Sequence, residues 1–194
     1  MAVFQTMPLW DHSLAQLQWG AAIGASLVGA ICDVRTKRIP NWLTGAALMS
    51  GLLWALWLGG WRGVAESGCA CTLLGAPFVV LWAYGGGGAG DAKLMGAVGA
   101  WLGLANGVVA LLAVVCWGAV LGMMLALVRG RIGPVLGNLR DLAFFGAVTV
   151  WHGATFSGRP RLQAMDGVPM PYGVSILCGV LTAAAGVLLW HDYL

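Results

Sequence analysis

Long apolar runs alternate with short polar breaks along this chain, and most of the runs are long enough to cross a membrane as a helix. A transmembrane helix needs about 20 apolar residues. We predict such spans at about residues 14–32, 42–60, 67–84, 107–128 and 171–190. A sixth apolar segment, 92–105, reaches only about 21 Å as a helix, so we expect the bilayer to thin around it or a watery cavity to lie beside it.

The breaks carry their own signals. Pro40 disfavours helix at the residue before it, and Asn41 is a suitable N-cap for the next helix. The glycine-rich stretch 85–90 interrupts any helix. A further apolar run, 142–151, is too short to cross and predicts a helix lying at the interface. The pattern as a whole predicts an all-α integral membrane protein, a bundle of six transmembrane helices with one short interfacial cytoplasmic helix.

Composition agrees with this pattern and narrows the class of protein. The chain has 194 residues, of which 60% are apolar and 9% are charged, against about 25% charged in soluble domains. Mean hydropathy is +0.85. We therefore do not expect a soluble enzyme, a disordered chain or a nucleic-acid binder, and we expect residues 1–194 to form one transmembrane domain in a lipid bilayer. The 31 glycines, and small residues at helical spacing such as Ala92, Gly96 and Ala100, predict closely packed helices.

The basic residues fall mostly on one side of the predicted bundle. We place the breaks at 33–41, 85–93 and 129–170 on one side of the membrane. The other side then has a single basic residue, Arg62. The first side then holds Arg35, Lys37, Arg38, Lys93, Arg129, Arg131, Arg140, Arg159 and Arg161. Because cytoplasmic loops are enriched in Lys and Arg, this side is expected to be cytoplasmic. The assignment depends on segment 92–105 crossing the membrane.

No metal or cofactor site is expected. The five cysteines lie in or beside apolar runs and form no C-x-x-C pair, which is typical of small packing residues. No His, Glu or Cys cluster has the spacing of metal ligands.

Two of the seven acidic residues, Asp33 and Asp91, stand where an apolar helix meets the predicted cytoplasmic face. An ionisable group at such a depth is costly and is a candidate functional residue. Each also has a plainer interpretation: Asp33 as a counter-ion for Arg35 or Lys37, and Asp91 as an N-cap for the segment that follows. Together they suggest paired-carboxylate hydrolysis, in which one carboxyl keeps a proton while the other acts as the base.

Short motifs around these aspartates carry a resemblance to a known family. The motifs are Asp33-x-Arg35-x-x-x-Ile39-Pro40-Asn41, Gly88-x-Gly90-Asp91-x-Lys93-Leu94 and Pro171-Tyr172-Gly173. In this order and spacing the chain resembles the aspartic prepilin peptidases, multi-span inner-membrane proteases of the GxGD type. The resemblance covers about residues 14–190, and its third motif is less specific than the first two.

The resemblance implies an activity and a site. It implies that Asp33 and Asp91 are catalytic, and that the substrates are type IV prepilins or pseudopilins, cut at the cytoplasmic side after the Gly that ends a short basic leader. It also implies supporting or substrate-binding roles for the other motif residues: Arg35, Pro40, Asn41, Gly88, Gly90, Lys93, Pro171, Tyr172 and Gly173. The expected location is the bacterial inner membrane.

One departure from the family pattern refines this expectation. Larger members carry an N-terminal region with paired C-x-x-C motifs that is associated with methylation of the new pilin N-terminus, and this sequence has no such motif. It looks like the short, peptidase-only branch of tight-adherence (Flp-type) pilus systems, so we expect cleavage without methyl transfer. The alternatives are a small transporter or proton relay that uses membrane aspartates, and an inactive assembly subunit. A presenilin-type protease would need a Pro-Ala-Leu motif that is not found.

Overall fold

The computed structural model describes residues 12–83, 87–128, 130, 133 and 172–191, and the elements within these ranges are all helices. The helices are α1 (His12–Thr36), α2 (Asn41–Ala83), α3 (Ala89–Val128) and α5 (Tyr172–His191). Three of them, α1, α2 and α3, are long and apolar enough to cross a membrane. The all-helical membrane class is therefore confirmed, while the number of crossings stays a prediction.

The chain divides into two compact units, residues 1–118 with 170–194, and residues 119–169. In the second unit the structure describes the last part of α3, where the N–H of Gly130 donates to the carbonyl of Leu127 at 3.1 Å. The interfacial helix predicted at 142–151 lies outside the described residues, as do Asp141, Asp166 and Pro171.

Single glycines break the two longest helices. Gly60 in α2 has φ 58° and ψ −147°, and Gly103 in α3 has φ 70° and ψ −173°. These are backbone conformations that essentially only glycine adopts. The chain turns back at both points. Gly63 lies against Ala55 within α2, and Gly96 and Gly107, on either side of Gly103, lie against the same part of α2, at Cys71 and Leu74. Predicted span 42–60 therefore ends at the observed break, and the break predicted near 105 is a turn at Gly103.

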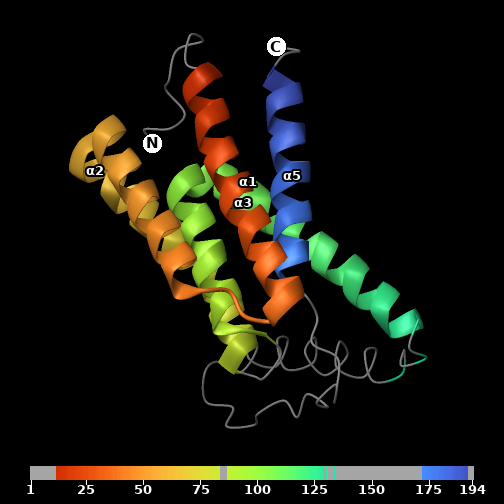
Figure 1. Cartoon of the computed structure of the whole chain (residues 1–194). Coiled ribbons are helices and arrows are strands. Elements are labelled where there is room, and N and C mark those ends of the chain that lie inside the picture. Colours follow the sequence, from red (N-terminus) through yellow and green to blue (C-terminus); the bar gives the residue numbers. More distant parts are fainter. Residues whose placement is uncertain (1–11, 84–86, 129, 131–132, 134–171, 192–194) are drawn as a thin grey trace, which may run out of the picture. The chain divides into compact units, whose positions relative to one another are not determined.

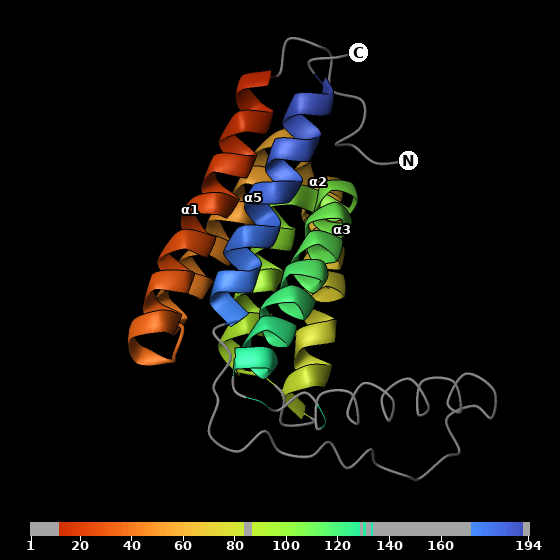
Figure 2. The same ribbon diagram turned by 90° about the vertical axis from the view of Figure 1, so that its right-hand side faces the viewer.

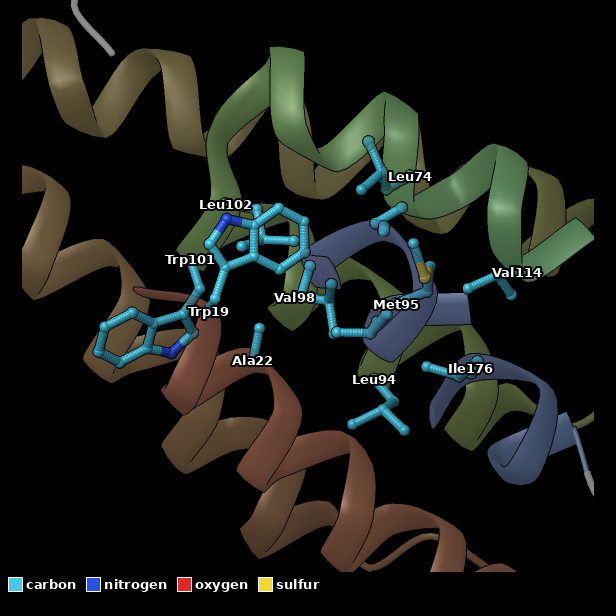
Figure 3. Close-up of a cluster of buried hydrophobic side chains, with 14 of the residues drawn as sticks. Trp19, Ala22, Leu74, Leu94, Met95, Val98, Trp101, Leu102, Val114 and Ile176 are labelled. Atoms are coloured by element: carbon cyan, nitrogen blue, oxygen red, sulfur yellow. The ribbon is translucent and has the colours of Figure 1, made fainter. Parts of the chain in front are cut away.

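The short segment of α3, residues 89–102, forms the centre of the bundle. Leu94, Met95 and Val98 are buried, as are Trp101 and Leu102 (Figure 3). Apolar side chains from the other helices surround them: Trp19, Ala22, Leu74 and Ile176. As a helix this segment is shorter than the hydrocarbon core of a bilayer. The structure shows that it is surrounded by protein, so neither a thinned bilayer nor a watery cavity is required.

Small residues allow this central segment to approach α2 closely. A Cβ on Gly75 would lie 3.2 Å from the carbonyl oxygen of Ala92, and a Cβ on Gly99 would lie 2.8 Å from that of Ala70. The Ser67 hydroxyl donates to the carbonyl of Ala100 across the same interface at 3.0 Å. These contacts confirm the prediction of tight helix packing around Ala92, Gly96 and Ala100. Lipid supplies no hydrophobic force between helices, so close backbone contact must hold them together.

Helix α1 packs along α5 and also contacts α2 (Figures 1 and 2). The C-terminal end of α1 lies at the same end of the bundle as the beginnings of α2, α3 and α5 (Figure 1). This end carries the polar breaks of the sequence and the candidate site.

Candidate active site

The approach of α1 to α3 places the two candidate aspartates at the same level. A Cβ on Gly29 of α1 would lie 2.7 Å from Cδ2 of Leu94 in α3, so the helices are in close contact there. The two segments run in opposite directions (Figure 1). Asp33 follows Gly29 by one turn, and Asp91 precedes Leu94 by one turn. Both carboxylates therefore lie just beyond this contact, toward the polar end of the bundle.

Asp33 is buried, with 8% of its surface exposed. Its Oδ2 accepts a hydrogen bond of 3.0 Å from the N–H of Gly173, in the first turn of α5. Arg35 and Lys37 are both exposed. Within the described ranges Asp33 forms no ion pair with either of them, so the counter-ion interpretation is not supported.

Asp91 is equally buried, at 7% exposure, in the first turn of α3. Its Oδ2 accepts a hydrogen bond from the N–H of Gly88 at 3.1 Å, and its own N–H donates to the carbonyl of Gly88, also at 3.1 Å. This is the geometry of a side chain that reaches back from the third helical position to the N-cap. The expectation that Asp91 caps this helix is thus correct, although from inside the first turn.

Asp33 and Asp91 are the only charged side chains that the described part of the chain buries. Both lie at the polar end of the bundle, Asp33 in the last turn of α1 and Asp91 in the first turn of α3. Burying even one carboxylate is expensive unless its oxygens are hydrogen-bonded or paired. Two such groups, brought together from positions 58 residues apart, form an arrangement that folding alone does not require.

Around the aspartates, Lys93 and Asn41 connect the beginnings of α3 and α2. The Lys93 Nζ donates to Oδ1 of Asn41 at 2.8 Å. Asn41 is the first residue of α2, and the carbonyl of Pro40 accepts the N–H groups of Leu43 and Thr44. The expectation that Asn41 is the N-cap is therefore wrong: Pro40 occupies the cap position, and the Asn41 side chain binds Lys93 instead.

The remaining motif residues play different parts. Gly90 lets the chain before α2 approach α3, since a Cβ there would lie 3.0 Å from Cβ of Ile39. Sequence reasoning did not single out Ile39 for this contact. Arg35 is exposed at the end of α1, and Pro171 lies outside the described residues. Within the described ranges no three His, Cys, Asp or Glu side chains gather in a way that could hold a metal ion.

This geometry defines a class of protein: an all-helical membrane protein with two buried carboxylates at one end of its bundle. The family model described as the type IV leader peptidase family matches residues 20–127, more than half of the chain. The chain therefore belongs to the type IV leader peptidase family, which indicates a peptidase that acts on prepilins. No curated protein and no solved structure matches the chain. The matched region includes Asp33 and Asp91, whereas Tyr172 and Gly173 lie beyond it.

Proposed function

We propose that this protein is an aspartic endopeptidase that removes the short basic leader from Flp-like prepilins, cutting after the leader's terminal Gly at the cytoplasmic face of the inner membrane. The observation that carries the proposal is the pair Asp33 and Asp91, the only buried charged side chains of the described residues. Family membership supplies the reaction class, and this pair supplies the groups that can perform it.

The chemistry follows from the proximity of the two carboxyls. Two neighbouring carboxylates do not both ionise readily, so the working form carries one proton. The ionised carboxyl takes a proton from water, which attacks the peptide carbonyl, while the protonated carboxyl donates a hydrogen bond to the carbonyl oxygen. Breakdown of the tetrahedral intermediate then moves a proton to the leaving amine. Asp33 and Asp91 are the proposed catalytic residues.

The charges near the site support a cytoplasmic orientation. Arg35, Lys37 and Arg38 are exposed at the end of α1, beside the site, whereas Arg62 follows the Gly60 turn. Basic residues accumulate on the cytoplasmic side of membrane proteins. Trp57 and Trp61, 70% and 81% exposed beside that turn, are typical of side chains that anchor a protein at the opposite interface.

The basic leader must approach a site surrounded by cationic side chains. Anionic lipids attract a basic segment to the cytoplasmic surface of the membrane. We therefore propose that the lipid surface, rather than an acidic groove of the protein, concentrates the precursor.

The proposal predicts the bond that is cut. Membranes containing the protein, incubated with a Flp-like precursor, should release a leader that ends in Gly, and mass spectrometry of both products locates the cut. A precursor in which Val replaces this Gly should be cut at least about 10-fold more slowly, because the larger side chain displaces the scissile bond. Equal processing of both precursors, or a cut at another bond, would contradict the proposed specificity.

The shared proton predicts a bell-shaped pH profile. Only the singly protonated pair is active, so the cleavage rate should fall on both the acidic and the alkaline side of its maximum. The measurement is the initial rate in proteoliposomes across a pH series, with the intactness of the protein checked at each pH by returning samples to the optimum. A flat profile would show that the two carboxyls do not work as a coupled pair.

A further inference from the structure

The first turn of α5 offers a hydrogen-bond donor to the candidate site. The first four N–H groups of a helix have no partner within the helix. An N-cap side chain usually binds one of them, at the second or third helical position. Helix α5 begins at Tyr172, so Gly173 is its second residue. The acceptor for the Gly173 N–H is Oδ2 of Asp33, which comes from α1, 140 residues away in the sequence.

Glycine is the residue that makes this contact fit. A Cβ on Gly173 would lie 3.0 Å from Cβ of Asp33, 3.2 Å from its Oδ2 and 3.1 Å from Cα of Ala30. The first and last of these are fixed by the backbone of α1, so a larger residue would have to push the two helices apart. Both Gly173 and Asp33 are buried, and the hydrogen bond between them is shielded from water.

The second aspartate has a matching arrangement. Asp91 is held by a backbone N–H as well, that of Gly88 at the beginning of α3. Each carboxylate therefore has its Oδ2 bound to a backbone donor at the beginning of a helix, and α5 is the element that contributes the donor for Asp33.

We propose that Gly173 is a positioning residue of the peptidase site: its N–H fixes the Asp33 carboxylate through Oδ2 and leaves Oδ1 to exchange a proton with the attacking water. The inference rests on the proposed function. Charge-assisted hydrogen bonds are short and strong, and they set orientation as well as energy. A carboxylate held in this way has one oxygen committed to the fold and one available for the reaction.

The test compares three glycines of α5 in the full-length protein, reconstituted in proteoliposomes with a synthetic Flp-like precursor. Gly173→Ala should lower kcat about 10²-fold per folded molecule, because displacing a reacting group by about 1 Å costs that much, while KM stays unchanged. The readout is kcat separated from KM, because a change in packing alone lowers the amount of folded protein and leaves kcat per folded molecule unchanged.

Two controls separate positioning from packing. A Cβ on Gly186 would meet nothing within 4 Å, so Gly186→Ala should match the wild type in rate and pH profile. A Cβ on Gly179 would lie 2.5 Å from the Val114 backbone. Gly179→Ala should therefore reduce the amount of folded protein, while the molecules that do fold keep the wild-type kcat.

Should Gly173→Ala fail to fold, the aspartate side of the bond provides the test. Asp33→Asn keeps an oxygen that can accept the Gly173 N–H, whereas Asp33→Ala does not, so Asp33→Ala should unfold at a temperature several degrees lower. Equal unfolding temperatures would overturn the inference. The inference would also be overturned if Gly173→Ala had the same kcat as Gly186→Ala while Asp33→Asn is inactive. In that case the proposed function would still stand. If Asp33→Asn cleaves at the wild-type rate, the proposed function fails and the inference fails with it.

Discussion

Replacing Asp91 by asparagine is expected to reduce prepilin cleavage by about 10³-fold or more, and Asp33→Asn is expected to do the same. General acid–base catalysis contributes about 10² to 10⁴ in rate, and either substitution removes one member of the pair that shares the proton. Asparagine keeps the size of the side chain and an oxygen that can accept the N–H of Gly88 or Gly173. Both variants should therefore fold and reach the membrane.

The measurement is the initial rate of precursor processing, normalised to folded protein in the membrane. Glu66→Gln is the matched control, because it removes a carboxylate from the same chain, beyond the Gly60 turn, where Glu66 is half-buried. This variant should process precursor at the wild-type rate. Normal processing by either Asn variant would exclude the paired-carboxylate mechanism, and loss of rate in all three would indicate a general effect of charge.

Replacing Gly99 by valine is expected to destabilise the bundle by about 3 kcal/mol, the upper part of the range for overpacking. A Cβ at this position would lie 2.8 Å from the carbonyl oxygen of Ala70, 3.0 Å from its carbonyl carbon and 3.2 Å from the N of Cys71. All three are backbone atoms of α2, so no side-chain rotation can make room. The central segment of α3 and the second part of α2 would have to separate.

Thermal unfolding in detergent measures this effect. Gly24→Val provides the control, since a Cβ on Gly24 would meet nothing within 4 Å and the residue is exposed on α1. The control should unfold within a few degrees of the wild type, whereas Gly99→Val should unfold at a clearly lower temperature or fail to accumulate. Similar unfolding temperatures for the two variants would show that the helices do not approach each other as closely as the structure indicates.

The helices were largely predictable because the length of an apolar run is a strong indicator of a membrane-spanning helix. The apolar run 14–32 lies inside α1, and the break at 33–41 correctly separates α1 from α2. The central position of segment 89–102 was not predictable. From Leu94 on, its side chains are apolar all round, and hydrophobicity distinguishes membrane from water but not a lipid neighbour from a protein neighbour. Its repeated small residues were the only sign of close packing.

The candidate site was predictable only in part. Asp33 and Asp91 were conspicuous because acidic side chains are rare within apolar helices. Their hydrogen-bond partners were not, since the donors are backbone N–H groups that every residue except proline possesses. The contact of Asn41 with Lys93 also depends on tertiary structure. Local sequence favoured a capping role for Asn41, and the position of α3 gave its side chain another partner.

The turns at Gly60 and Gly103 bear on how the chain enters the membrane. Each joins two apolar helical segments through one glycine instead of a polar loop. When such a pair of segments inserts together as a hairpin, very little hydrophilic chain has to be translocated, and translocation of polar groups through hydrocarbon is the costly part of insertion. At these two turns, insertion therefore requires the transport of hardly any polar chain.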